Sequence, residues 1–265
     1  MILKMLIFGL LLASFACSRH GLSESEFPSR SVIVNGSEYK YRIYVPKDRV
    51  PGQKIPVMLY LHGSNRRGDD NESQVEDLRD VIRSDPEYFP YVVVFPQCGA
   101  EAFWSCPMIE QALGALDQTI AEFDGDNDRL YLAGYSMGGF GVWHTAIAHP
   151  DKFAALVPVA GGVEPLGVID DKDRSLLSPE VVDAASSGDT YKAYAAVLTK
   201  TPAWIVHGAD DGTVPVAASR KMFAAMQASG DPSVVYKELK GVGHGSVTTA
   251  FRDPELVKWL ADRRR

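Results

Sequence analysis

The sequence predicts one α/β domain, with a mostly parallel sheet covered by helices on both faces. Short apolar runs alternate with segments of helical periodicity along most of the chain. A length of 265 residues is enough for one well-buried core. An Asn35-Gly36 pair between two alternating segments predicts an antiparallel hairpin near the N-terminus.

The hairpin comes first and pairs Ser31 to Val34 with Tyr39 to Val45. The next segment, Pro56 to His62, is continuously apolar, as expected of a strand that is covered on both faces. After it, predicted strands and helices alternate along the chain, and helical connections between successive strands make the sheet parallel. Strands are predicted at 91–95, 129–133, 153–159, 202–207 and 234–239, and helices at 72–83, 108–123, 138–149, 216–229 and 254–263.

The predicted domain covers residues 31–265, and one polar segment interrupts its alternation. That segment, 162–201, contains the charge run 170–174. It is too short for a second domain, so we expect a cap insertion of a helix or two over the functional site. The charge run is expected to be a solvated face rather than a ligand site.

The N-terminus has the pattern of an export signal. Lys4 precedes an apolar run from Met5 to Leu12, and small residues end at Ala16. Residues 1–16 are therefore predicted to be a signal peptide and 17–30 a polar tether, which places the protein in the periplasm or outside the cell. Cys17 follows the candidate cleavage point, where a bacterial lipoprotein carries its lipid. Lipid attachment at Cys17 and free secretion both stay open.

Composition excludes some classes of partner. Hydrophobic residues make up 46% and charged residues 23% of the chain, which is typical of soluble globular proteins. The net charge of −7 argues against nucleic acid as a partner, because an acidic surface repels phosphates.

Two cysteines remain inside the domain. Cys98 and Cys106 could form a disulfide in an exported protein, and two free thiols are the equal alternative, because the spacing does not show how close their Cα atoms lie.

A nucleophile is predicted where a strand meets a helix. Gly134 and Gly138 flank Ser136 at two residues on each side. A serine hydroxyl is a weak nucleophile and must be held exposed beside a base. A strained strand-to-helix turn does this, and it needs small residues because the chains pack closely there.

The base and the acid are expected later in the chain. His244 follows the last predicted strand in a glycine-rich loop, while His62 and His207 end buried strands and are expected to shape turns. Asp210 and Asp211 both follow the strand at 202–207, and spacing alone does not choose between them. Two backbone amides are expected to hold an oxyanion: Met137, directly after the serine, and Ser64, in the loop after the strand at 56–62.

Together these segments resemble the α/β-hydrolase superfamily. The stretches that carry the resemblance are LHGSNRRGDD, FPQC followed by Trp104, DRLYLAGYSMGGFGVWHTAIAHPDKFAALVPVAGG, PAWIVHGADDGTVPV and GVGHGS. They are most similar to a bacterial esterase and "predicted peptidase" branch that includes feruloyl-esterase-like and polyhydroxybutyrate-depolymerase-like enzymes. The resemblance implies an α/β-hydrolase fold and a Ser136, His244 and Asp211 triad, with Asp211 chosen because it lies three residues before the Val of the Val-Pro pair.

The resemblance also implies cleavage of small-molecule or polymer esters. No metal or cofactor is expected, because the sequence has no His-Glu-x-x-His, no paired-cysteine metal spacing and no phosphate-cradling glycine loop. Trp104 is expected to form an aromatic wall of the substrate pocket, although core packing explains it equally well. Two alternatives stay open: a serine peptidase with the same triad, and an exported binding protein of the same fold that has lost catalysis.

Overall fold

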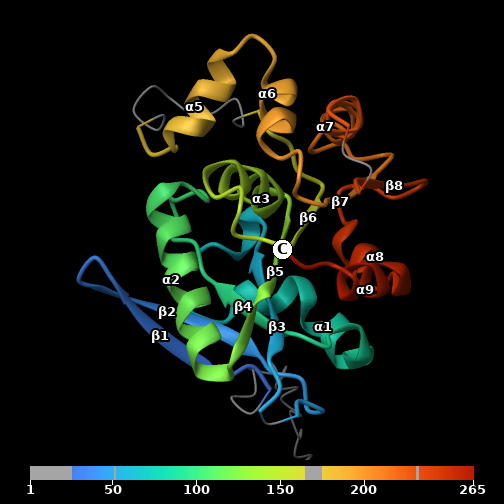
Figure 1. The fold of residues 1–265 in the computed structure, drawn as a ribbon. Helices are drawn as coiled ribbons and strands as arrows, with labels where there is room; N and C mark the ends of the chain where they lie inside the picture. Colours follow the sequence, from blue (N-terminus) through green and yellow to red (C-terminus); the bar gives the residue numbers. More distant parts are fainter. Residues whose placement is uncertain (1–25, 51, 165–174, 231–232) are drawn as a thin grey trace, which may run out of the picture.

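A computed structural model describes residues 26–50, 52–164, 175–230 and 233–265. It confirms the predicted fold class: a mostly parallel sheet of eight strands in the order β1-β2-β4-β3-β5-β6-β7-β8 lies between layers of helices (Figure 1). The strands are β1 (Ser29–Val34), β2 (Ser37–Tyr44), β3 (Ile55–Leu61), β4 (Val92–Pro96), β5 (Gly125–Tyr135), β6 (Ala155–Val159), β7 (Trp204–Gly208) and β8 (Val235–Leu239).

The antiparallel part of the sheet is confined to its N-terminal edge. β1 and β2 form the predicted hairpin, with Val34 opposite Ser37 and with Asn35 and Gly36 at φ 51° and 79°. β2 also runs antiparallel to β4, while every pairing from β4 to β8 is parallel. The parallel strands consequently end at one edge of the sheet, where the loops that carry the predicted site residues begin.

Alternation along the strands divides the core between the two faces. One cluster packs side chains of β3, β5 and β6 against α2, α3, α5, α6 and α7. The other packs the intervening strand residues against α1, α8 and α9. These helices are α1 (Glu76–Ser84), α2 (Cys106–Phe123), α3 (Met137–Ala148), α5 (Pro179–Ser186), α6 (Thr190–Val197), α7 (Ala217–Ala228), α8 (Val247–Phe251) and α9 (Pro254–Ala261), and short 3₁₀ turns occupy Ser64–Arg66, Ser73–Val75 and Pro86–Tyr88.

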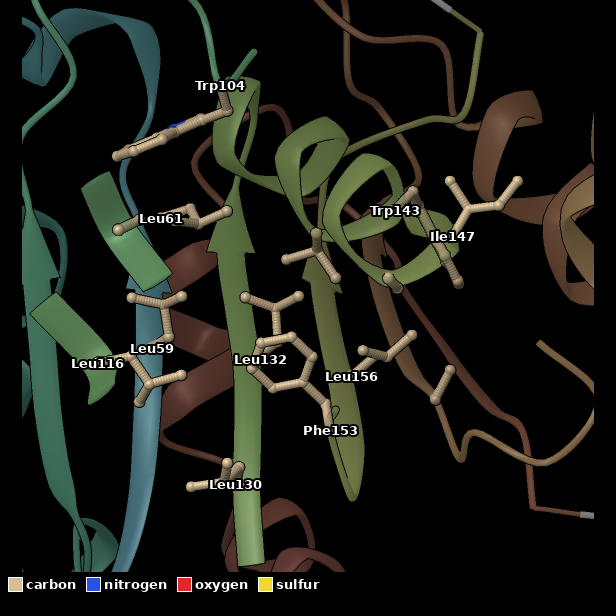
Figure 2. Packing of buried hydrophobic residues seen from close by; sticks show 14 of the residues in the cluster. Leu59, Leu61, Trp104, Leu116, Leu130, Leu132, Trp143, Ile147, Phe153 and Leu156 are labelled. Atoms are coloured by element: carbon tan, nitrogen blue, oxygen red, sulfur yellow. The ribbon is translucent and has the colours of Figure 1, made fainter. Parts of the chain in front are cut away.

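The first cluster supports the helix that follows the predicted nucleophile. In Figure 2, the alternate leucines of β3 and β5 lie on the same side of the sheet as Trp143 and Ile147 of α3. α3 is buried along its whole length apart from its last residue. Because this helix is enclosed by the core, its N-terminus is a rigid support for Ser136.

Several element boundaries differ from the sequence expectations. The tether was expected to reach residue 30, but Phe27 is fully buried and β1 begins at Ser29, so the domain starts earlier. β5 extends to Gly125 because its start pairs with Ile55 beyond a register shift. The short helix α8 was not predicted. The predicted signal peptide, Cys17 and the whole charge run 170–174 lie outside the described residues.

Candidate active site

Ser136 lies at the sharp turn between β5 and α3. Its backbone has φ 54° and ψ −117°, a conformation that a residue with a side chain rarely adopts. A Cβ on Gly138 would overlap the carbonyl of Leu61, and one on Gly134 would overlap the carbonyl of Gly138. Only glycine therefore fits at these two positions, which is the packing reason expected from the sequence pattern.

Ser136, His244 and Asp211 form one continuous chain of hydrogen bonds. The His244 Nε2 lies 2.8 Å from the Ser136 Oγ, and the His244 Nδ1 lies 2.8 Å from the Asp211 Oδ2. These residues lie 108 and 33 positions apart in sequence and follow β5, β8 and β7. The parallel sheet thus brings together all three residues that the sequence predicted as a triad.

Asp211 is held as a carboxylate by its surroundings. Its side chain is fully buried, and its Oδ1 accepts hydrogen bonds from the amides of Thr213 (2.8 Å) and Val214 (2.9 Å). Burial alone would raise the pKa of Asp211, but the hydrogen bonds from His244 and these amides outweigh it and lower the pKa. Asp210 is exposed, so the structure resolves the choice that spacing left open in favour of Asp211.

The loop that carries His244 is anchored by Tyr135. The Tyr135 hydroxyl donates to the His244 carbonyl at 3.0 Å, and the two rings lie 5.2 Å apart between centroids. The His244 side chain keeps about a quarter of its surface exposed. Tyr135 therefore supports the His244 ring on one side, and part of the ring stays accessible to solvent and to a substrate.

Met137 follows Ser136 directly in the chain, and Ser64 lies in the loop after β3, the two segments that the sequence predicted. Met137 begins α3, so its amide has no carbonyl one turn earlier in the helix to bind. Ser64 begins a 3₁₀ turn directly after β3, and α3 packs against the end of β3 through Gly138. Both amides are the first of a helical turn, where free N–H groups favour negative charge.

A buried histidine fixes the loop before Ser64. The His62 Nε2 accepts from the Cys98 amide at 2.9 Å, and its Nδ1 lies 2.7 Å from the Gly63 carbonyl. Burial lowers the pKa of His62 to about 4, so the ring is neutral and its proton lies on Nδ1. Trp104 donates from Nε1 to the His62 carbonyl at 3.0 Å. The sequence marked His62 as a turn residue, but its partners lie on distant segments that spacing does not reveal.

An acidic side chain from α1 supports the same loop. The Asp77 Oδ2 accepts from the Gly63 amide at 3.2 Å, while Arg66 bonds the Asp77 Oδ1 at 3.0 Å. The Asp77 side chain is 5% exposed, which strengthens this ion pair relative to a surface pair. The loop that carries the Ser64 amide is therefore fixed at both ends, and no sequence motif pointed to Asp77.

A cavity of about 190 Å³ opens beside the N-terminal half of α3. Trp104 lines it and is itself 3% exposed and packed in the core. Both interpretations of Trp104 thus describe its position. The other lining residues are Glu101, Ala102, Phe103, Ser105, Met137, Phe140, Gly141, His144, Leu176 and Leu177.

The disulfide considered from the sequence is not formed, since Cys98 and Cys106 are both free thiols. Cys98 is fully buried in the core, where burial raises its thiol pKa to about 12. Cys106 is half-buried at the start of α2, near the charges of Glu110 and Glu180. The two side chains face different surroundings, which explains why the short spacing does not pair them.

The described residues offer neither a cluster of metal ligands nor a helix that could cross a membrane. Within ranges 26–50, 52–164, 175–230 and 233–265, no three His, Cys, Asp or Glu side chains are grouped so that they could bind a metal ion. No helix in those ranges has the length and apolar character needed to cross a membrane.

Solved structures share this fold over most of the chain. A thermostable esterase is 28% identical with a TM-score of 0.70, and the match covers 91% of this chain and 64% of that one. A ferulic acid esterase is 18% identical with a TM-score of 0.66, covering 89% and 98%. At 18% identity the likeness shows the fold alone. This chain spans less than two thirds of the thermostable esterase.

Sequence comparison also finds hydrolases. The bifunctional acetylxylan esterase/xylanase XynS20E of Neocallimastix patriciarum is 30% identical over 130 residues, which are 48% of this chain and 18% of that protein. Residues 107–261, more than half of the chain, match the prolyl oligopeptidase family. That match contains Ser136, Asp211 and His244. The chain therefore has the α/β-hydrolase fold and belongs to the prolyl oligopeptidase family.

Proposed function

We propose that this protein hydrolyses carboxylic esters, with Ser136 as nucleophile, His244 as general base and Asp211 as the residue that orients His244. The single observation that carries the proposal is the unbroken hydrogen-bond chain from Asp211 through His244 to Ser136. A hydroxyl bonded to an imidazole that is itself bonded to a buried carboxylate is the arrangement that activates serine.

The reaction proceeds in two halves. The His244 Nε2 accepts the Ser136 proton while Oγ attacks the ester carbonyl, and the amides of Met137 and Ser64 bind the oxyanion. The tetrahedral intermediate collapses, and His244 returns the proton to the departing alcohol. Water, deprotonated by His244, then attacks the acyl-enzyme and releases the acid and free Ser136. Asp211 stays ionised throughout, in agreement with its lowered pKa.

Ester cleavage is favoured over peptide cleavage by two of the relatives described above. The protein at 30% identity has an acetylxylan esterase activity in its name, and the solved structure at 28% identity is an esterase. The cavity beside Met137 is mostly apolar, which suits the acyl group of an ester, with Trp104 as one wall.

The test is hydrolysis of p-nitrophenyl esters from acetate to decanoate by the wild type and by Ser136→Ala. We expect turnover by the wild type and at least a thousandfold loss in Ser136→Ala, the size typical of a lost triad member. Labelling of Ser136 by a fluorophosphonate probe is the check that does not depend on the choice of ester. If neither turnover nor labelling occurs, the protein is instead a non-catalytic binding protein of this fold.

A peptidase is the second candidate, because the family match is to the prolyl oligopeptidases. It would use the same three residues and differ in its leaving group. Comparing kcat/KM for a p-nitrophenyl ester with that for the p-nitroanilide of the same acyl group separates the two. A ratio that favours the anilide would replace the esterase proposal.

Export is proposed from the sequence alone, through a signal peptide at residues 1–16 and, as one alternative, lipid attachment at Cys17. The check is expression in a bacterium with labelled palmitate, for the full chain and for Cys17→Ser. Label on the wild type and not on the variant supports a lipid anchor. Unlabelled protein in the medium or periplasm supports free secretion, and uncleaved cytoplasmic protein rejects both.

A further inference from the structure

His207 contacts the loop that carries Asp211. It is the penultimate residue of β7, and its side chain is fully buried. Its Nε2 lies 3.0 Å from the Val214 carbonyl and 3.2 Å from the Asp211 Oδ2. Its Nδ1 lies 2.7 Å from the Ser219 Oγ, on α7. The ring thus contacts both ends of the turn from Asp211 to Val214.

These contacts determine which nitrogen of His207 carries the proton. A proton on Nδ1 would leave the Nε2 lone pair facing two acceptor oxygens at 3.0 and 3.2 Å, which is repulsive. With the proton on Nε2, the ring donates toward both oxygens, and the Ser219 hydroxyl donates to Nδ1. The other acceptor near that hydroxyl, the Gly161 carbonyl, is 3.5 Å away and competes weakly.

We propose that His207 is a positioning residue for the reaction proposed above: its Nε2–H, shared between the Val214 carbonyl and the Asp211 Oδ2, holds the Asp211 carboxylate in the orientation that receives the His244 Nδ1–H. The inference rests on the proposed role of Asp211.

The Val214 backbone makes this arrangement cooperative. Its amide donates to the Asp211 Oδ1 at 2.9 Å, and its carbonyl accepts from His207 at 3.0 Å. Removing the His207 N–H therefore loosens the turn at Val214 and also removes a donor near the Oδ2 that binds His244. Hydrogen-bonding partners that orient metal ligands contribute about tenfold to a hundredfold to activity, and we expect an effect of that size here.

The arrangement also has a consequence for pH dependence. The titratable groups facing His207 are Asp211 and His244 from the neighbouring loops and Glu238, which lies opposite it on β8. Burial lowers the pKa of His207, so the ring stays neutral while the enzyme works. Without its N–H, the Asp211 carboxylate stabilises protonated His244 more strongly, and the acid limb of the kcat/KM profile moves to higher pH.

The experiment compares the wild type with His207→Leu, His207→Gln and Ser219→Ala on one p-nitrophenyl ester. Leucine fills the space without a donor, whereas a glutamine amide can place an N–H where Nε2 lies. We expect kcat to fall about tenfold to a hundredfold in His207→Leu with KM changed less than about threefold, and most of that loss to be recovered in His207→Gln. Ser219→Ala should lose about twofold to fivefold, because Nδ1 then lacks its donor.

Tyr131→Phe is the matched control. It removes a buried hydrogen bond, from Tyr131 to the Leu260 carbonyl at 2.8 Å, that does not contact the triad. We expect it to lower the free energy of unfolding without moving the acid limb. If His207→Leu keeps the kinetics and pH profile of the wild type, or if His207→Gln is as impaired as a folded His207→Leu, His207 only packs and the proposal is wrong.

The tautomer can be measured without any substrate. In ¹⁵N-histidine-labelled full-length protein, with His207→Gln used to assign the signal, we expect Nε2 protonated and Nδ1 unprotonated. A proton on Nδ1 overturns the proposal even if His207→Leu does not fold. A wild type inactive toward every ester, with no labelling of Ser136, would instead reject the proposed function.

Discussion

Ser136 holds a backbone conformation that costs free energy. Its φ of 54° is unfavourable for a residue with a Cβ, and such conformations cost about 1–3 kcal/mol. Hydrogen bonds on both sides hold the Ser136 backbone in this conformation. The Ser136 amide donates to the Val159 carbonyl at 2.9 Å, and the Ser136 carbonyl accepts from the Phe140 amide at 3.1 Å. The strain is retained because the turn presents Oγ to the His244 Nε2.

Substituting Asp211 by Asn should abolish most catalysis while leaving the fold intact. The amide oxygen can still accept from Thr213 and Val214, but the residue loses the charge that stabilises protonated His244 and can stabilise the wrong tautomer. We expect kcat to fall about 10⁴-fold, with the melting temperature changed by only a few degrees. Both are measured on purified protein, with p-nitrophenyl acetate and by thermal unfolding.

Asp210→Asn is the matched control for this substitution. Asp210 is the exposed neighbour that the sequence could not separate from Asp211. We expect its activity to stay within about twofold of the wild type, because an exposed carboxylate acts on the imidazole only weakly through water. Activity lost in Asp210→Asn and kept in Asp211→Asn would reverse the assignment of the acid.

Among the helices, strands and loops, the features that the sequence could predict are those that depend on residues close together in the chain. The glycines around Ser136, the apolar run before His62 and the loop of His244 each follow from short-range packing or strand periodicity, so the fold class and the candidates Ser136 and His244 could be predicted. Asp211 was preferred to Asp210 only through the resemblance to the α/β-hydrolase superfamily. The supporting contacts could not be predicted. His62 bonds Cys98, and Asp77 bonds Gly63, across 36 and 14 positions of sequence, and such pairs leave no periodic signal.

The cap region illustrates the same limit. Two helices, α5 and α6, occupy the described part of the segment 162–201, and Leu176 and Leu177 reach the cavity beside α3. The Cys106 amide donates to the Leu176 carbonyl at 2.8 Å, which fixes this segment against the start of α2. A backbone contact of that kind depends on tertiary packing and on no particular side chain, so the sequence predicted an insertion of a helix or two over the site but not the contacts that hold it.

Gly138→Ala should separate β3 from α3. The added methyl would overlap the Leu61 carbonyl, which is backbone and cannot rotate away. We expect the free energy of unfolding to fall by about 1–3 kcal/mol or more, and kcat to fall as well, because Ser136 and the Ser64 amide would move apart. Urea unfolding and ester kinetics measure the two effects.

The control is Gly99→Ala, where the added methyl makes only an ordinary contact with Ala102 at 3.8 Å. Its free energy of unfolding should stay within about 0.5 kcal/mol of the wild type, as for most substitutions without a named steric cause. Equal stability of Gly138→Ala and Gly99→Ala would show that β3 and α3 tolerate a wider separation than this packing implies.

For the whole molecule, one edge of the sheet gathers nearly all the functional groups. β3, β5, β7 and β8 end there and contribute the loops of Ser64, Ser136, Asp211 and His244. The core below them contains two histidines, His62 and His144, that are buried without a carboxylate bonded to either ring. Burial therefore lowers the pKa of each to about 4, and this links global stability to pH.

The unfolding free energy should fall as the pH drops from about 6.5 to about 4. In that window the unfolded chain protonates His62 and His144, whose ordinary pKa is about 6.5, while the folded protein keeps both neutral. The unfolded state binds more protons, so stability rises with pH across the window, by up to about 3 kcal/mol for each ring. Asp211, with its lowered pKa, adds a loss only below about pH 4.

Urea unfolding at pH 7, 6, 5 and 4.5 measures this dependence for the wild type and for His144→Gln. Glutamine cannot titrate, so the variant should lose less stability between pH 7 and 4.5, although it starts from a lower value because a buried contact with Val163 changes. His149→Gln is the control, since His149 is exposed and should contribute a smaller slope. Identical slopes for the wild type and His144→Gln would mean that His144 takes up its proton in the folded protein as readily as in the unfolded chain.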